Sequence, residues 1–300
     1  MTRVTLVGTG AMACLFGARL TAVAEVTLVG TWAEGLAALH ERGIVIEEAG
    51  GATTVPVRAA HLDDDLPSAD FVIVLVKAWQ TARVAKRLPA LLKPDGLALT
   101  LQNGLGNFET LAETLGPERV MLGVTTQGAT LLGPGRVRPG GAGPTHIAQH
   151  PRLVPLVDLL RSAGFDVLQP PTSGLQPLLW GKLVVNCGIN ALTALLRVPN
   201  GELLNRPEAA VLMEQAAMEC AQVAQAQNIR LPFTDPVTRV REVARATAVN
   251  YSSMFQDILR GAPTEIDAIN GAVARVGAQM GVPAPVNETL WRLVKALVNL

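Results

Sequence analysis

Three polar residues interrupt the apolar segment GKLVVNCGINALTAL (residues 181–195) at steps of four: Lys182, Asn186 and Asn190. The apolar run predicts a buried helix, in which four residues advance about 400° and bring the three side chains onto one stripe. A positioned ammonium can stabilise developing negative charge and then supply a proton. The stripe is equally compatible with a lysine that extends to solvent along an apolar surface and two structural asparagines.

A second candidate site is the sequence GTGAMA, which follows the strand-like segment 3–7 and opens a predicted helix. It has the pattern G-x-G-x-x-A. Gly8 permits a tight turn, Gly10 lets the backbone approach a pyrophosphate, and Ala13 allows close packing of helix and strand. The helix N-terminus then faces the phosphates. We therefore predict a dinucleotide site at Gly8, Gly10, Ala11, Met12 and Ala13.

The choice between the two nicotinamide cofactors is usually made at the end of the second strand, here residues 26–30. An acidic residue there binds a ribose hydroxyl, whereas a nearby arginine favours the 2′-phosphate. This chain has Thr31 at that point, then Trp32. A threonine hydroxyl could donate to a phosphate, so the residue types leave NAD(H) and NADP(H) both open.

Two further polar stretches follow strand-like runs. Lys77–Gln80 (KAWQ) comes after the apolar run 71–76, and the stretch LQNGLG, which contains Asn103, ends the run 97–102. Ligands of open parallel sheets bind at the carboxyl ends of the strands. Lys77, Gln80 and Asn103 are therefore expected to share a cleft, although Asn103 and Gly104 alone could form an ordinary turn.

The elements that must hold these residues alternate between strand and helix in the first half of the chain. A buried, nearly continuous apolar strand such as 71–76 is typical of a parallel sheet with helices on both sides. Residues 127–148 are rich in turn formers and predict a hairpin on the edge of that sheet. The predicted strands are 3–7, 26–30, 71–76, 97–102, 120–125 and 166–169, and the predicted helices are 11–22, 32–42, 78–92, 106–115 and 151–164.

A change from α/β to all-helical structure is predicted near residues 169–177, QPPTSGLQP. Prolines there stop the last strand, and Ser173 and Gln176 have the spacing of a capping box. No convincing strand follows. Helices fit 206–228, 235–249, 264–280 and 286–299, in addition to the helix that carries Lys182. The chain is therefore predicted to be an α/β dinucleotide-binding domain, residues 1–170, followed by an all-α domain, residues 171–300.

Composition narrows the class of protein. The 300 residues are 49% apolar and carry 25 basic and 25 acidic side chains, with no basic run, so nucleic acid and anionic membrane are not expected partners. The three cysteines and four histidines have no metal-ligand spacing, and no metal is expected.

The apolar start resembles a signal peptide, but its glycines and the strand that follows argue against one. No uninterrupted apolar run reaches membrane-spanning length. A reduced, cytoplasmic protein is expected.

Seven segments together resemble the ketopantoate reductase (2-dehydropantoate 2-reductase) family over nearly the whole chain. In chain order they are GTGAMA, VKAWQ, LQNGLG, WGKLVVNCGINALTAL, PNGEL, SSMFQDI and TEIDAINGAV. The resemblance implies a Rossmann domain followed by a helical domain, with the active site between them. It also implies reduction of ketopantoate to pantoate with NADPH, on the route to pantothenate and coenzyme A.

Residue roles follow from the resemblance. It implies that Lys182 is the general acid, and that Glu265 lies near it and contacts the substrate hydroxyl. Asn103 would stand between nicotinamide and substrate, and Lys77 and Gln80 would contact the cofactor. The remaining substrate contacts that the resemblance implies are Asn186, Asn190, Asn250 and Ser253. Taken alone, Glu265 could simply be an acid in the first turn of a helix after the cap Thr264.

One position departs from the family pattern. Thr31 stands where the family has an arginine, so the resemblance favours NADP(H) without excluding NAD(H). Two other functions compete with the one implied: reduction of a different 2-keto acid by the same fold, and dinucleotide sensing without catalysis. Retention of Lys182, Asn103 and Glu265 argues against the sensor. The long apolar helices of the second half are compatible with a homodimer.

Overall fold

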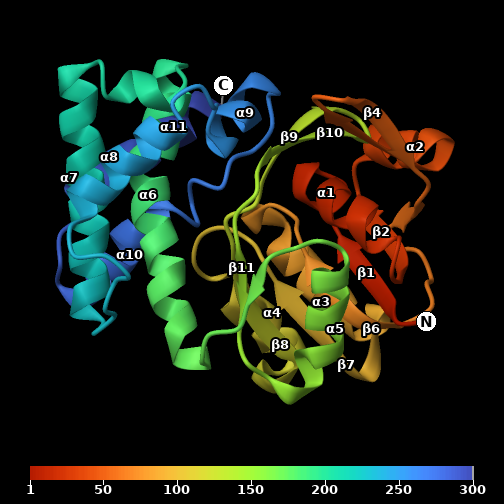
Figure 1. Cartoon of the computed structure of the whole chain (residues 1–300). Coiled ribbons are helices and arrows are strands. Elements are labelled where there is room, and N and C mark those ends of the chain that lie inside the picture. The colour runs from red at the N-terminus through yellow and green to blue at the C-terminus, as the bar shows by residue number, and fades with distance from the viewer. Residues whose placement is uncertain (299–300) are drawn as a thin grey trace. The chain divides into compact units, whose positions relative to one another are not determined.

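The computed structural model describes residues 1–298. Its contacts divide the chain into two compact units (Figure 1). Unit 1 comprises residues 1–102 and 107–175, and unit 2 comprises residues 103–106 and the chain from Gln176 onward. The tetrapeptide Asn103–Gly106 therefore belongs by its contacts to unit 2, although the residues on either side of it belong to unit 1.

Unit 1 is built on an eight-stranded sheet with the order β12-β11-β8-β7-β6-β1-β2-β5. All its neighbouring strands pair in parallel except β8 and β11. The strands are β1 (Arg3–Val7), β2 (Glu25–Gly30), β5 (Arg58–His61), β6 (Ala69–Val74), β7 (Leu92–Thr100), β8 (Val120–Thr125), β11 (Thr145–Ile147) and β12 (Val167–Leu168).

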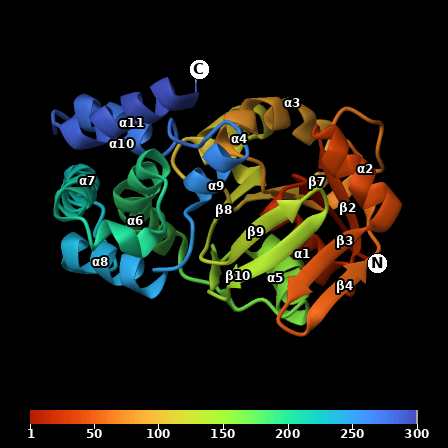
Figure 2. The ribbon, with the colours of Figure 1, turned by 90° about the horizontal axis from the view of Figure 1, so that it is seen from above.

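Helices cover both faces of this sheet because alternate residues of the central strands point to opposite sides. In β6, Phe71 and Ile73 join the core under α1 and α5, whereas Val72 and Val74 join the core under α3 and α4. Figure 2 shows α3 and α4 on one side of the sheet and α1 and α5 on the other. The helices are α1 (Ala11–Leu20), α2 (Ala33–Arg42), α3 (Thr81–Leu91), α4 (Asn107–Leu115) and α5 (Val154–Ser162).

A second, four-stranded sheet has the order β4-β3-β10-β9. The predicted hairpin exists as β9 and β10, but its placement on the edge of the main sheet was wrong. β10 pairs in parallel with β3 instead, and this pairing buries Val137 together with Ile44. The sequence analysis missed β3, β4 and β5, since strands of only four or five residues give a weak periodic signal. The strands are β3 (Ile44–Glu48), β4 (Gly51–Val55), β9 (Gly128–Gly133) and β10 (Arg136–Gly141).

The regular secondary structure of unit 2 is all helical within its described residues, as predicted. The predicted ends were wrong by a few residues, and the last predicted residue, 299, lies outside the described residues. A short helix, α9, was not predicted. The helices are α6 (Leu175–Leu196), α7 (Pro207–Ala226), α8 (Pro236–Ala246), α9 (Ser253–Leu259), α10 (Asn270–Met280) and α11 (Pro285–Val298).

Two predicted helix starts were wrong. Ser173 caps nothing, because it lies inside a short 3₁₀ turn, Thr172–Gly174, that precedes α6. The segment predicted to open a helix at residue 264 instead forms turns, and α10 begins only at Asn270. The reason is a backbone bond from outside the helix: Leu105 donates to the carbonyl of Ala268 at 2.9 Å. Glu265 therefore lies in a turn before the helix and not in its first turn.

Helix α6 is the core helix of unit 2. Together with the preceding turn it is long and apolar enough to cross a membrane by length and composition, which the search for an uninterrupted apolar run did not anticipate. However, 72% of its apolar window is buried inside the protein, as in the core helix of a soluble protein. Gly188 allows the other helices to approach. A Cβ there would lie 2.9 Å from the carbonyl oxygen of Met213 on α7 and 2.8 Å from the side chain of Val240 on α8.

This packing predicts the effect of Gly188→Ala. Alanine should favour the helix by about 1 kcal/mol over glycine, but its methyl group must displace the α7 backbone, at a cost of about 1–3 kcal/mol in a packed core. We expect urea unfolding followed by circular dichroism to show a net loss of stability. Gly133→Ala, where a Cβ meets nothing within 4 Å, is the control and should be close to neutral. A Gly188→Ala protein as stable as the control would contradict the packing argument.

Candidate functional site

The glycine loop of unit 1 joins β1 to α1. Gly8 has φ +140°, which a side chain rarely adopts, and its amide donates to Val29 at 2.7 Å. Gly10 is the N-cap of α1, and a Cβ added there would meet nothing within 4 Å. No side chain caps the helix and no acidic residue lies in its first turn. The amides of Ala11, Met12 and Ala13 thus open a helix whose N-terminus suits an anion, so these residues fit a dinucleotide pyrophosphate.

Thr31 directly follows β2, as predicted, and is half-buried. The neighbouring strand β5 ends beside it, since Gly30 pairs with His61. Trp32 is the N-cap of α2, and its ring covers Gly35, where an added Cβ would meet the indole at 2.4 Å. Trp32 is therefore a packing residue at the start of α2. Contact between Thr31 and the cofactor ribose stays a prediction.

The two polar stretches after β6 and β7 lie at neighbouring strand ends, because β6 and β7 are adjacent and parallel. Lys77 and Gln80 are both half-buried on the short 3₁₀ turn that leads into α3. The stretch after β7 contributes Gln102 to unit 1 and the next four residues to unit 2. Gln102 is buried and donates to the carbonyl of Val76 at 3.0 Å.

The tetrapeptide Asn103–Gly106 brings a polar side chain to Glu265 in unit 2. Asn103 Nδ2 donates to Glu265 Oε2 at 3.3 Å, across 162 residues of sequence. Gly104, with φ +82°, allows this close approach, since a Cβ there would lie 2.4 Å from the carbonyl oxygen of Ala268. Glu265 itself is 4% exposed. Two residues that the sequence predicted for one site are thus in contact.

The stripe on α6 lies in the structure as the spacing predicts. Lys182 and Asn186 are half-buried and Asn190 is buried. Burial lowers the pKa of Lys182 from 10.5 to about 8, while the negative charge of Glu265 acts in the opposite direction and raises it. Lys182 and Glu265 therefore interact electrostatically, as the resemblance implied. A lysine with this pKa is mostly protonated at neutral pH and can give up its proton readily.

The other two predicted substrate residues lie in the segment before and at the start of α9. Asn250 is exposed and Ser253 is half-buried. The sequence analysis missed their neighbour Ser252, which is buried and accepts hydrogen bonds from Thr193 Oγ1 at 2.7 Å and from the amide of Phe255 at 3.1 Å. Thr193 is three residues beyond Asn190 on α6, so this bond fixes the start of α9 beside the polar stripe.

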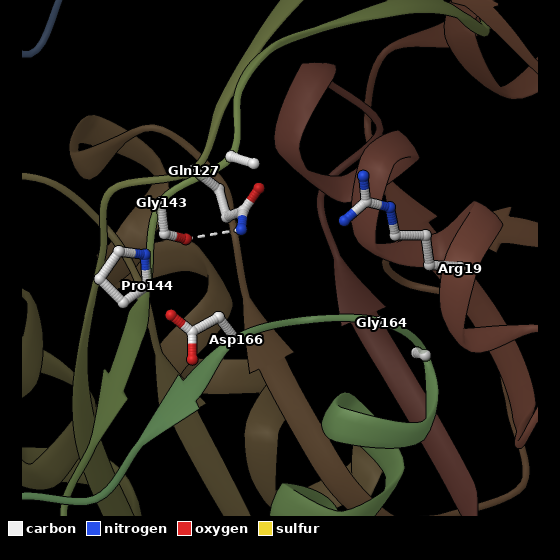
Figure 3. A pocket seen from close by; sticks show the side chains of 8 residues that line it. Arg19, Gln127, Gly143, Pro144, Gly164 and Asp166 are labelled. Atoms are coloured by element: carbon white, nitrogen blue, oxygen red, sulfur yellow. Dashed lines mark hydrogen bonds between the residues drawn. The ribbon is translucent and has the colours of Figure 1, made fainter.

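A pocket of about 320 Å³ lies elsewhere in unit 1 (Figure 3). Arg19, Gln127 and Asp166 point toward it, and Arg19 also lies over the ring of Phe165 at 5.0 Å. None of the predicted site residues lines it. We therefore assign no part of the predicted chemistry to this pocket.

Comparison with known proteins adds to this geometry. Residues 4–152 match the family model described as ketopantoate reductase PanE/ApbA, and residues 175–298 match that of its C-terminal domain. The chain belongs to the ketopantoate reductase family. A 2-dehydropantoate 2-reductase of Halobacterium salinarum is 36% identical over 301 residues, covering 98% of each chain. The predicted fold class, a Rossmann-type domain followed by an all-α domain, is confirmed.

Two solved structures are similar to nearly the whole chain. A ketopantoate reductase of the PanE/ApbA family from Ralstonia eutropha has a TM-score of 0.90, 31% identity and 99% coverage of both chains. A D-mandelate dehydrogenase, solved with NADH and anilino(oxo)acetate, has a TM-score of 0.92 and 27% identity, covering 99% of this chain and 98% of the other. Solved structures similar to this chain thus include both a ketopantoate reductase and a D-mandelate dehydrogenase.

The electrostatics of Lys182 predict the effect of Glu265→Gln. Removal of the carboxylate charge should shift the pKa of Lys182 below about 8, because that charge raises it. The pKa can be measured from the pH dependence of Lys182 acylation, followed by peptide mass spectrometry. In urea the wild-type pKa should return to the ordinary value for lysine, about 10.4. An unchanged or higher pKa in the folded variant would disprove the proposed electrostatic link.

Proposed function

We propose that this protein reduces 2-dehydropantoate to pantoate with a reduced nicotinamide dinucleotide, in the cytoplasm, as a step toward pantothenate and coenzyme A. The observation that carries the proposal is Lys182: a half-buried lysine with a pKa near 8, in line with two asparagine amides and under the influence of Glu265. Its membership of the ketopantoate reductase family supports the same reaction.

In this proposal the glycine loop and α1 hold the dinucleotide. The backbone amides of Ala11, Met12 and Ala13 would bind its pyrophosphate, and Lys77 and Gln80 would contact the rest of the molecule. The reduced nicotinamide supplies the hydride that the keto carbon receives. No acidic residue of the first turn of α1 opposes the phosphates.

The residues of unit 2 would handle the keto acid. As the carbonyl oxygen gains negative charge, the ammonium of Lys182 stabilises it and then donates a proton from Nζ to the oxygen. Glu265 keeps Lys182 protonated and contacts the new hydroxyl, while Asn103 is oriented by its bond to Glu265. The amides of Asn186 and Asn190 bind polar groups of the substrate without adding charge. Asn250 and Ser253 complete the proposed substrate contacts.

We propose NADPH as the hydride donor, on the resemblance to the family. Thr31 weakens this preference because its hydroxyl replaces a guanidinium, which is the stronger partner for a 2′-phosphate. The similar D-mandelate dehydrogenase was solved with NADH. The preference should therefore be smaller than an arginine at position 31 would give.

The deciding experiment is the loss of reduced-nicotinamide absorbance after addition of ketopantoate, run in parallel with NADPH and NADH. We expect oxidation of the cofactor, with the higher kcat/KM for NADPH. Benzoylformate serves as a second keto acid, since it tests the chemistry of the mandelate enzyme. Turnover of benzoylformate alone would replace the proposed substrate, and no turnover with a protein that binds either cofactor would support a sensor.

Lys182→Ala tests the general acid directly. We expect kcat to fall by about 10²–10⁴, the usual contribution of a general acid, while the Kd of the cofactor stays the same. The control is Lys295→Ala, which removes an exposed lysine of the same unit that is paired with Asp267 and should leave kcat unchanged. Near-normal turnover by the Lys182→Ala variant would overturn the assignment of the acid.

A further inference from the structure

Four buried side chains and the carbonyl of Val76 form one hydrogen-bonded network at the carboxyl ends of β6 and β7. The hydroxyl of Thr100 donates to Gln102 Oε1 at 3.0 Å. Gln102 Nε2 donates in turn to the carbonyl of Val76 at 3.0 Å and to Thr81 Oγ1 at 2.8 Å. The hydroxyl of Thr81 donates a hydrogen bond to Asn107 Oδ1 at 2.8 Å. The four side chains are between 1% and 8% exposed.

The members of this network border two stretches of the proposed site. Val76 and Thr81 flank residues 77–80, which carry Lys77 and Gln80. Gln102 and Asn107 flank residues 103–106, which carry Asn103. The hydroxyl of Thr81 and the side-chain amide of Gln102 thus connect the residues that border both stretches. All of these bonds lie within unit 1.

We propose that Thr81, through its bonds to Gln102 and Asn107, is a positioning residue that fixes the end of the cofactor stretch 77–80 and the two residues that border the Asn103 stretch, all within unit 1. Thr81 is not itself a reacting group. It acts through the residues at the ends of the two stretches. The roles of the two stretches rest on the proposed function, whereas the network itself does not.

The chemistry of the hydroxyl explains why Thr81 is the central member. It accepts one hydrogen bond and donates another, and Gln102 uses both of its amide protons. Loss of the hydroxyl would therefore leave a buried donor on Gln102 and a buried acceptor on Asn107 without this partner. A movement of the ends of the two stretches would let these groups find new partners. A shift of about 1 Å in a positioned catalytic group can lower a rate about 100-fold.

The test compares Thr81→Val, which keeps the shape and removes the hydroxyl, with Thr81→Ser, which keeps the hydroxyl. We expect Thr81→Val to lower kcat about 10- to 100-fold, and to raise the Kd of NADPH about fivefold by the same displacement of residues 77–80. Thr81→Ser should restore both values to within about threefold of wild type, because a single hydroxyl is enough for both bonds. The Kd is measured by nicotinamide fluorescence without a keto acid, so it tests the proposal even if ketopantoate is not the substrate.

Thr145→Val is the matched control. Thr145 and Thr125 form another buried hydroxyl pair in unit 1, at 2.9 Å, which joins β11 to β8. This variant should lower Tm as Thr81→Val does and leave kcat and Kd within about twofold of wild type, as expected of a purely structural bond. If Thr81→Val matches the control in all three quantities, or if Thr81→Ser loses as much activity as Thr81→Val, the proposal is wrong. Should Thr81→Val not fold, the smaller Thr81→Ala takes its place beside Thr81→Ser.

Discussion

A lysine held in an apolar helix is the constraint on which the rest of the proposed site depends. Removal from water disfavours the charged form of Lys182 and lowers its pKa to about 8, and the nearby charge of Glu265 opposes this effect. The balance leaves an ammonium that is stable at neutral pH and yet acidic enough to give up its proton. Neither burial alone nor an exposed ion pair would produce this property.

This balance requires that both side chains be held firmly in place. Helix α6 is fixed from several sides: Gly188 admits α7 and α8, and the carbonyl of Cys187 accepts a bond from the buried Asn270 of α10 at 3.1 Å. Asn270 also donates to Asn287 of α11, at 3.0 Å. Buried hydrogen bonds of this kind between helices favour one arrangement over slightly shifted ones. Glu265 is held by its own segment in front of α10, which forms a turn and accepts a hydrogen bond from the amide of Leu105 through the carbonyl of Ala268.

Within each unit, further hydrogen bonds fix segments that carry or border the proposed site residues. The hydrogen bond between Thr193 and Ser252 attaches the start of α9 to α6. The hydrogen bonds of Thr81 connect the residues that border the two stretches after β6 and β7. Both use a threonine hydroxyl between segments that are distant in sequence. A hydroxyl that both donates and accepts is well suited to join two segments, since each contributes the complementary group.

The sequence by itself determined the features that depend on local periodicity and local chemistry. The glycine pattern between a strand and a helix, the alternation of elements in the first half, the helical second half and the stripe of Lys182, Asn186 and Asn190 are all encoded within short windows. Only the tertiary structure decided the rest. It brought Asn103 to Glu265, paired β10 with β3, and moved the start of α10 to Asn270. It also set the pKa of Lys182. These features depend on contacts between residues far apart in the chain and on burial, and neither is recorded in the spacing of residues along one segment.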